Sequence, residues 1–284
     1  MTEIALEYVQ AITGTHLNRA DTLTSYVQHL LPRLRFQLPA LSLSATDCNK
    51  LMMPILKAAL PKMHINRNTA RSIVHGPITL GGMALPHLAT VQGIDKLHLL
   101  LGRIRLEDDT GKLLHIDLSY VQLLSGASTL FLNRPYSDYT WIEWGWVTSL
   151  WRFLADTNLT FQYPCLWTPS TVREGDVCIM DYFLSQRLPH RALQTLNSCR
   201  IYLQVITLSD ISSNNGKYIL PEAKAGLCIP YRTSNLDWPI QGRPSPAEWR
   251  TWRHTLAYLE DKGRLALPIR ILVSRIAPAM GPIL

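Results

Sequence analysis

The chain has 284 residues, of which 47% are hydrophobic and 17% charged, and it carries a net charge of +7. This apolar content is enough for a buried core and excludes a globally disordered protein. The positive charge is typical of proteins that bind polyanions such as nucleic acid, and equally of ordinary basic proteins.

Apolar residues at helical spacing predict that most of the chain is helical. In chain order, the expected helices cover residues 22–38, 45–60, 69–75, 88–104, 116–124, 140–156, 176–186, 189–208 and 246–259. Short strands are expected only at the periphery, around Phe161 and Tyr218, and SNNG at 213–216 could turn a hairpin. The predicted fold class is therefore mainly α and multi-helical, with few short strands.

Local signals predict where several of these helices begin and end. Pairs with capping-box spacing precede three of them: Ser44 with Asp47, Thr140 with Glu143, and Ser245 with Glu248. Asn68 is expected to cap 69–75. Pro54 is expected to bend 45–60 and Pro61 to end it. The charged segment LEDDTGK at 106–112 reads as a turn, which divides an N-terminal helical region, 1–106, from a larger C-terminal one, 107–284.

No segment predicts a membrane span or a secretory signal. No stretch has the ~20 apolar residues that a membrane-spanning helix needs. The first ten residues, MTEIALEYVQ, contain an early acid and lack a basic start. We expect no membrane partner and an intracellular location, cytoplasmic or nuclear.

The five cysteines are widely spaced and include no CxxC pair. This spacing signals neither a zinc knuckle nor a redox dithiol, so we expect buried thiols in a reducing compartment and no metal site. No phosphate-binding, dinucleotide-binding, metalloprotease or serine-hydrolase motif is present, so we expect no cofactor and no catalytic residue.

Gly81 and Gly82 stand side by side in ITLGGMALPHL. A phosphate-cradling loop needs exposed amides, usually at a helix start after a strand and with a nearby lysine, and none of these signals is present. The pair is better explained as a bend where residues with a β-carbon could not turn.

The stretch between Asp47 and Asp95 contains no acidic residue. Fixed positive charge without neighbouring carboxylates attracts phosphates and releases counterions. Four cations of this stretch could track a nucleic-acid backbone without reading its bases: Lys57, Lys62, Arg67 and Arg71. The alternative is a solvated face of an amphipathic helix pair.

Trp249 and Trp252 lie among the basic residues of the last predicted helix. Tryptophans interleaved with arginines suit single-stranded nucleic acid. Because the two are three residues apart, a stripe facing the protein core is the better explanation, and an exposed surface that docks a protein partner stays open.

Asp108 and Asp109 form the only Asp-Asp pair of the sequence. A polymerase needs its carboxylate pair on a tight hairpin between apolar strands, aimed at metal ions. Here the flanking residues are charged and a glycine turn follows, which indicates a surface turn.

Several long segments resemble the region that follows the palm in reverse transcriptases of non-LTR-type retroelements, as found in algal genomes. The resemblance starts in LRFQLPALSLSATDCNKLMMPILKAALPKMHINRNTARSIVHGPITLGGMALPHL and continues through VQGIDKLHLLLGRIR, DDTGKLLHIDLSYVQLLSG and NSCRIYLQVITLSDI to RPSPAEWRTWR. It covers roughly residues 21–256. In that family thumb-like helices lead into a bend with the pattern GGLG-I-x-x-L, and Ala84 stands where the pattern has its last glycine.

The resemblance implies a thumb-like helical bundle that grips a template–primer duplex by its phosphates. The positions that match this role are Lys57, Lys62, Arg67 and Arg71. The family's aromatic-Ala-Asp-Asp palm motif is absent, so no polymerase activity is expected. The segment 261–284 departs from the family pattern.

Two functions follow as expectations. The first is a non-catalytic C-terminal fragment of a retroelement reverse transcriptase that retains binding to the backbone of an RNA or DNA duplex. The second is a structural or protein-interaction module with no nucleic-acid role, whose partner could be a separate palm-containing chain.

Overall fold

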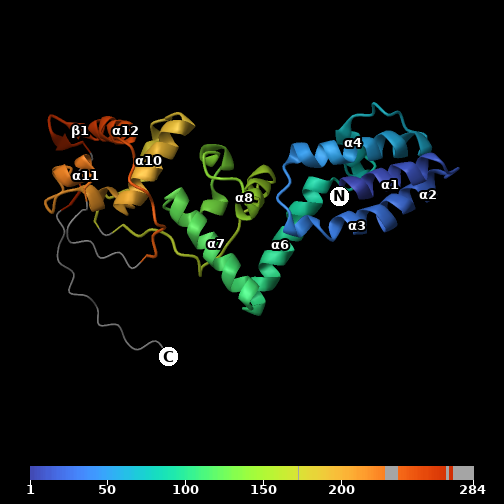
Figure 1. Cartoon of the computed structure of the whole chain (residues 1–284), viewed down its shortest axis with the longest axis horizontal. Coiled ribbons are helices and arrows are strands. Elements are labelled where there is room, and N and C mark those ends of the chain that lie inside the picture. The colour runs from blue at the N-terminus through green and yellow to red at the C-terminus, as the bar shows by residue number, and fades with distance from the viewer. Residues whose placement is uncertain (172, 228–235, 267–268, 271–284) are drawn as a thin grey trace. The chain divides into compact units, whose positions relative to one another are not determined.

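A computed structural model of the chain describes residues 1–171, 173–227, 236–266 and 269–270. These residues are mainly helical, and the one sheet among them is a two-stranded antiparallel hairpin of β1 (Glu260–Asp261) and β2 (Arg264–Leu265). The prediction of a mainly α, multi-helical fold is thereby confirmed (Figure 1). Most of the divergent tail, 261–284, lies outside the described residues.

The chain divides into two compact units, each made of two segments. The first unit comprises Met1–Leu118 and Glu143–Phe161, and the second comprises Ser119–Ile142 and Gln162–Leu284. This division differs from the expected boundary after residue 106, because 107–118 and 143–161 pack with the N-terminal helices. A charged turn in the sequence marks only a local break in the chain. It does not show that a later segment, here 143–161, packs with the N-terminal helices.

The first unit is a helical assembly in which α1 packs along α4. Its elements are α1 (Thr2–Thr13), α2 (Arg19–Thr24), η1 (Ser25–Leu30), α3 (Leu31–Arg35), η2 (Leu38–Ala40), α4 (Ala45–Lys62), α5 (Arg71–His75), η3 (Ile78–Leu80), α6 (Leu88–Leu106) and α8 (Trp146–Asp156). The buried face of α1, formed by Ala5, Tyr8 and Ile12, was not predicted from the sequence. Helix α7 (Asp109–Ser125) crosses the division between the units.

The helix expected at 22–38 is interrupted by a π-helical turn, Ser25–Leu30. Within it the Leu31 amide donates to the Tyr26 carbonyl, five residues back. Pro32 has no amide hydrogen to donate to a residue four positions earlier, so the regular ladder cannot continue through it. The pattern of apolar residues is helical throughout and does not reveal this change of winding.

Helix α4 begins as its capping signal predicts. The Ser44 hydroxyl accepts from the Asp47 amide at 3.1 Å, and the Asp47 carboxylate accepts from the Ser44 amide at 3.4 Å. The helix runs through Pro54 and Pro61 and ends at Lys62, slightly later than expected. Its apolar face is buried in the core of the first unit: Cys48, Met52, Ile55, Leu56, Ala59 and Leu60.

Helices α7 and α8 begin at other residues than predicted. The Asp108 carboxylate accepts from the Gly111 amide at 2.8 Å and so starts α7 at Asp109, within the expected turn. The expected helix start at Thr140 is wrong, because α8 begins at Trp146. The indole of Trp144 instead donates to the Ser42 carbonyl at 2.8 Å, a tertiary contact that a local capping pattern cannot predict.

The second unit packs α10 (His190–Leu203) against α12 (Pro246–Ala257). Its other elements are η4 (Phe131–Asn133), η5 (Tyr136–Tyr139), α9 (Ile179–Ser185), η6 (Leu208–Ile211), α11 (Pro221–Ala225), β1 and β2. The predicted start of α12 at Ser245 is confirmed, with a complete capping box. The expected helix 189–208 ends early, because Gln204 turns the chain with a φ of 55°. The expected hairpin at 213–216 is present, and the Ser213 amide donates to the Tyr218 carbonyl at 2.8 Å.

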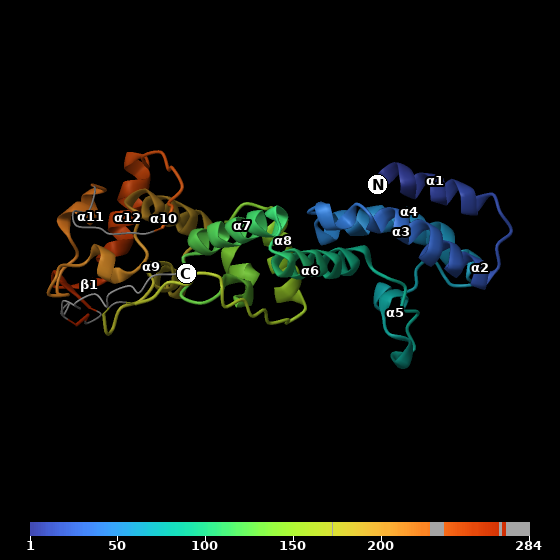
Figure 2. The ribbon, with the colours of Figure 1, turned by 90° about the horizontal axis from the view of Figure 1, so that it is seen from below.

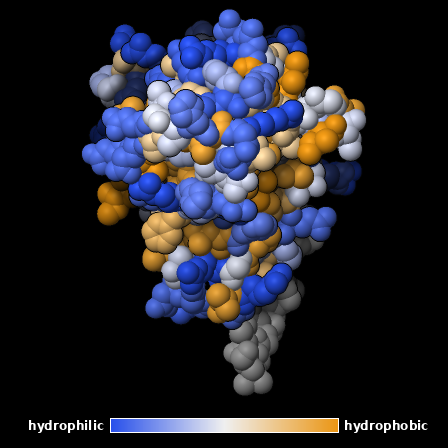
Figure 3. Space-filling model, turned by 90° about the vertical axis from the view of Figure 1, so that its right-hand side faces the viewer, coloured by the Kyte–Doolittle hydropathy of each residue, from blue (hydrophilic) through white to orange (hydrophobic). Residues whose placement is uncertain are grey.

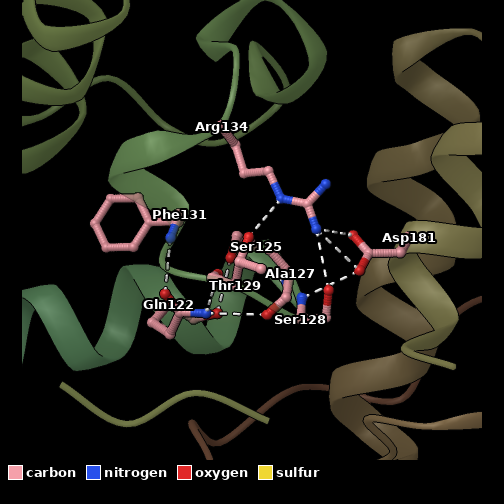
Figure 4. A network of polar contacts seen from close by, with 8 residues as sticks. All are labelled: Gln122, Ser125, Ala127, Ser128, Thr129, Phe131, Arg134 and Asp181. Carbon is pink, nitrogen blue, oxygen red and sulfur yellow. Dashed lines mark hydrogen bonds and ion pairs between the residues drawn. The ribbon is translucent and has the colours of Figure 1, made fainter. Parts of the chain in front are cut away.

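A polar network anchors the turn after α7 to α9 (Figure 4). The Gln122 amide donates to the carbonyls of Ala127 and Thr129 at 3.0 and 3.1 Å, and its oxygen accepts from the Phe131 amide at 3.0 Å. The Arg134 guanidinium donates to the Asp181 carboxylate of α9 at 3.1 Å. The fully buried Gln122 side chain thus satisfies three backbone groups of a turn that belongs to no helix or sheet.

Candidate nucleic-acid interface

Lys57 lies on the solvent face of α4. Its side chain is exposed, while Leu56, one residue before it, and Ala59, two residues after it, are buried. Lys50 and Met53, seven and four residues earlier, are also exposed, so the three residues line one stripe of the helix. Lys57 makes no ion pair with any described residue, which leaves its charge available to an external anion.

Lys62, at the end of α4, is partly occupied by the fold. Its ammonium donates to the Thr15 carbonyl and, at 3.5 Å, to the Thr13 carbonyl. Thr13 is the last residue of α1 and Thr15 lies two residues beyond it. Cations are favoured at this end of a helix by the helix dipole and by unsatisfied backbone oxygens. Lys62 therefore ties α1 to α4, and it is the least accessible of the four predicted contact residues.

Arg67 and Arg71 lie in and after the connection between α4 and α5, and both are exposed. Neither forms an ion pair within the described part of the chain. The expected cap at Asn68 is wrong: α5 begins at Arg71, and Asn68 instead donates its amide to the Asn66 side chain at 2.8 Å. The short polar turn that results carries Arg67 on the surface.

The predicted bend at Gly81 and Gly82 is confirmed. Gly81 has a φ of 78°, and a β-carbon on Gly82 would lie 2.2 Å from the Gly76 carbonyl oxygen. The amide of Gly81 donates to Ile78 and that of Gly82 to Pro77, at 3.0 and 2.9 Å. Because both amides are used within the turn, they are not free to cradle a phosphate.

The bend closes a loop that extends from the rest of the first unit (Figure 2). The segment that returns from the bend is hydrogen-bonded to α5, since the Leu85 amide donates to the Val74 carbonyl at 3.1 Å. At its tip, Ile78 and Leu80 are 73% and 84% exposed. The loop thus presents two apolar side chains a few residues after the exposed Arg71.

The segment that carries these cations has no acidic residues, since none occurs between Asp47 and Asp95. Figure 3 views the molecule from the end that carries α1 and α2, and hydrophilic side chains cover most of this face, with hydrophobic ones gathered toward its middle.

The two tryptophans of α12 are buried, with 5% of Trp249 and none of Trp252 exposed. The Trp252 indole donates to the Ala223 carbonyl at 3.0 Å. The core-stripe explanation is confirmed, and neither ring is available to stack on bases or to dock a partner. Arg250 and Arg253 on the same helix are exposed.

Asp108 and Asp109 have local roles at the start of α7. The Asp108 carboxylate accepts from the Arg103 guanidinium at 2.6 Å, and Asp109 pairs with Lys112 at 3.1 Å. Among the described residues, no group of three or more His, Cys, Asp or Glu side chains is placed to hold a metal ion.

Buried thiols are confirmed at Cys48, Cys178 and Cys199, and burial raises the pKa of Cys178 and of Cys199 to about 12. Cys165 is exposed, contrary to the expectation, and Cys228 lies outside the described residues.

No family model, no curated protein and no solved structure matches this chain. In the part of the chain that the structure describes, none of the helices combines the length and the apolar character needed to cross a membrane.

Proposed function

We propose that the chain is a non-catalytic, post-palm fragment of a retroelement reverse transcriptase that binds the phosphate backbone of a template–primer duplex. The observation that carries the proposal is the exposure of Lys57, Arg67 and Arg71 without ion pairs among the described residues. Lys62 fixes the end of α4, a few residues before Arg67, to the end of α1. The resemblance in sequence supplies the class of nucleic acid.

The test is the binding of the full chain to a fluorescently labelled RNA–DNA hybrid, followed by anisotropy. Contacts with phosphates release counterions, so each contributes a slope of about −0.9 in log affinity against log salt on duplex DNA. With three contacts we expect the affinity to fall by at least about tenfold between roughly 50 and 200 mM salt.

The triple variant Lys57→Ala, Arg67→Ala, Arg71→Ala should lose most of this binding and flatten the salt dependence. A matched control removes three exposed cations that form ion pairs and lie outside the α4 stripe: Arg33 with Glu7, Arg152 with Asp156, and Lys112 with Asp109. Equal losses in the two triple variants would show that net charge alone is responsible and would contradict the proposed interface.

A second candidate function is docking to a separate palm-containing chain. The observation that favours it is the exposure of Ile78 and Leu80 at the tip of the loop after α5, because exposed apolar side chains that cluster mark interaction sites. This candidate replaces the first if the chain shows no salt-sensitive binding to the hybrid.

A further inference from the structure

The loop between α5 and α6 is held in one shape by its own backbone. Four amides of its returning half donate to carbonyls of α5 or of the two residues after it, at 2.8 to 3.1 Å: Gly82 to Pro77, Met83 to Ile73, Ala84 to Gly76 and Leu85 to Val74. At the base, Val74 and Leu85 are 0% and 2% exposed and belong to the core of the first unit. The tip of the loop therefore stands on a base that is fixed to the core (Figure 2).

The tip presents two aliphatic side chains to the solvent. Every residue from 77 to 81 is exposed, and Ile78 and Leu80 keep 73% and 84% of their surface accessible. Because the backbone beneath them is already ordered, insertion of these side chains into an apolar surface costs little backbone entropy. The tip is thus suited to enter a partner rather than to be covered by the fold.

The charge of the segment favours a polyanion as that partner. No carboxylate occurs between Asp47 and Asp95, and the exposed cations Arg67 and Arg71 precede the tip by only eleven and seven residues. Arg71 begins α5, so this short helix separates the cation from the apolar tip. Nucleic acid presents the matching arrangement, with phosphates outside and stacked bases within, and aliphatic wedges enter it between base pairs.

The small size of the tip argues against the other apolar partners. One fourteen-carbon lipid chain gives only weak, reversible binding to a membrane, and two aliphatic side chains bury less than such a chain. A stable protein interface uses about 20–30 residues a side, whereas the exposed tip spans residues 77–81. Leucine and isoleucine are among the side chains that proteins insert between base pairs.

We propose that this loop is a wedge whose Ile78 and Leu80 insert between base pairs of the duplex, while Arg67 and Arg71 contact its phosphates. The inference rests on the proposed function, because it takes the same duplex as the partner. It adds a contact that does not depend on charge and that locally unstacks the bases. Burial of apolar side chains continues to contribute to the affinity when salt screens the phosphates.

The test compares salt titrations of the full chain on the labelled RNA–DNA hybrid. The double variant Ile78→Ser, Leu80→Ser should bind at least about tenfold more weakly at every salt concentration, because two aliphatic side chains lose their burial. The slope of log affinity against log salt should stay unchanged, since the phosphate contacts remain. The double variant Arg67→Ala, Arg71→Ala should flatten that slope instead.

A second readout reports insertion directly. The adenines of the DNA strand are replaced by 2-aminopurine, whose fluorescence rises when the base is unstacked. At saturation the unaltered chain should raise this emission, whereas Ile78→Ser, Leu80→Ser should not. The conservative double variant Ile78→Val, Leu80→Met keeps aliphatic side chains at the tip and should retain both the affinity and the rise in emission.

Leu106→Ser, Leu113→Ser is the matched control, because these side chains are 69% and 66% exposed in the first unit outside the loop. It should bind and unstack the hybrid like the unaltered chain. The wedge is overturned if the serine variant of the tip binds as tightly as the unaltered chain, or if the unaltered chain leaves the emission unchanged. With a persistent salt slope, that result leaves the phosphate interface intact and assigns the tip to a protein partner. Absence of salt-sensitive binding in the unaltered chain overturns the proposed function together with the wedge.

Discussion

Ala84 has a φ of 50°, in the left-handed region where a β-carbon is strained. The residue is exposed, and its amide donates to the Gly76 carbonyl at 2.8 Å, so the backbone conformation belongs to the bend and not to side-chain packing. At Ala84 the residue type therefore disagrees with the backbone conformation that the bend requires.

Ala84→Gly should therefore stabilise the chain by about 0.5–1 kcal/mol, because relief of left-handed strain exceeds the extra entropy of glycine in the unfolded state. The free energy of unfolding from urea titration measures this change. Ala11→Gly, at an exposed position inside α1, is the control and should destabilise by about 1 kcal/mol. A loss of stability in Ala84→Gly would contradict the assignment of strain.

At the scale of elements, local capping chemistry determines where some helices start. Helices α4 and α12 begin at Ser44 and Ser245, whose hydroxyls satisfy amides three residues later. Helix α8 does not begin at Thr140, because Trp144 and Trp146 donate to carbonyls of the segment before α4, at Ser42 and Pro39. Where such tertiary bonds are available, they outweigh a cap of about 1 kcal/mol.

Ser44→Ala should cost about 1 kcal/mol of unfolding free energy, since the Asp47 amide loses its acceptor and the α4 N-terminus frays. Circular dichroism during urea unfolding measures the change. Ser72→Ala, at an exposed serine of α5, should change the stability by less than about 0.5 kcal/mol. Equal effects of the two substitutions would show that the capping box does not stabilise α4.

At the scale of the whole molecule, each unit has its own buried core. In the first unit the core includes Met52 and Leu60 of α4, and in the second it includes Leu196 of α10 and Trp252 of α12. These two sets of residues belong to separate hydrophobic clusters. We therefore predict that a cavity in one core lowers mainly the stability of the unit that contains it.

Leu196→Ala should destabilise the second unit by about 2–5 kcal/mol through lost burial and a residual cavity. Hydrogen exchange should show faster exchange of the amides of α10 and α12, with those of α4 unchanged. Leu60→Ala should give the reverse pattern. Equal loss of protection in both units after either substitution would mean that the chain unfolds as one cooperative body.

By itself the sequence determined the helical class, the capped starts of α4 and α12, the bend at Gly81 and the core stripe of Trp249. Each of these depends on interactions within a few residues, namely helical periodicity, capping hydrogen bonds and the backbone freedom of glycine. At the candidate interface, Lys57, Arg67 and Arg71 are exposed, as expected for cations in a segment without acidic residues.

Only the tertiary structure decided the rest. It engages Lys62 at the end of α1, returns 143–161 to the first unit, and buries Lys96 and Gln92 beside one cavity. In the sequence Lys96 is one lysine among many in a helical pattern. Its burial depends on contacts with residues about 50 positions away in the chain, Ser42 and Ser149, and no local pattern carries information about such contacts.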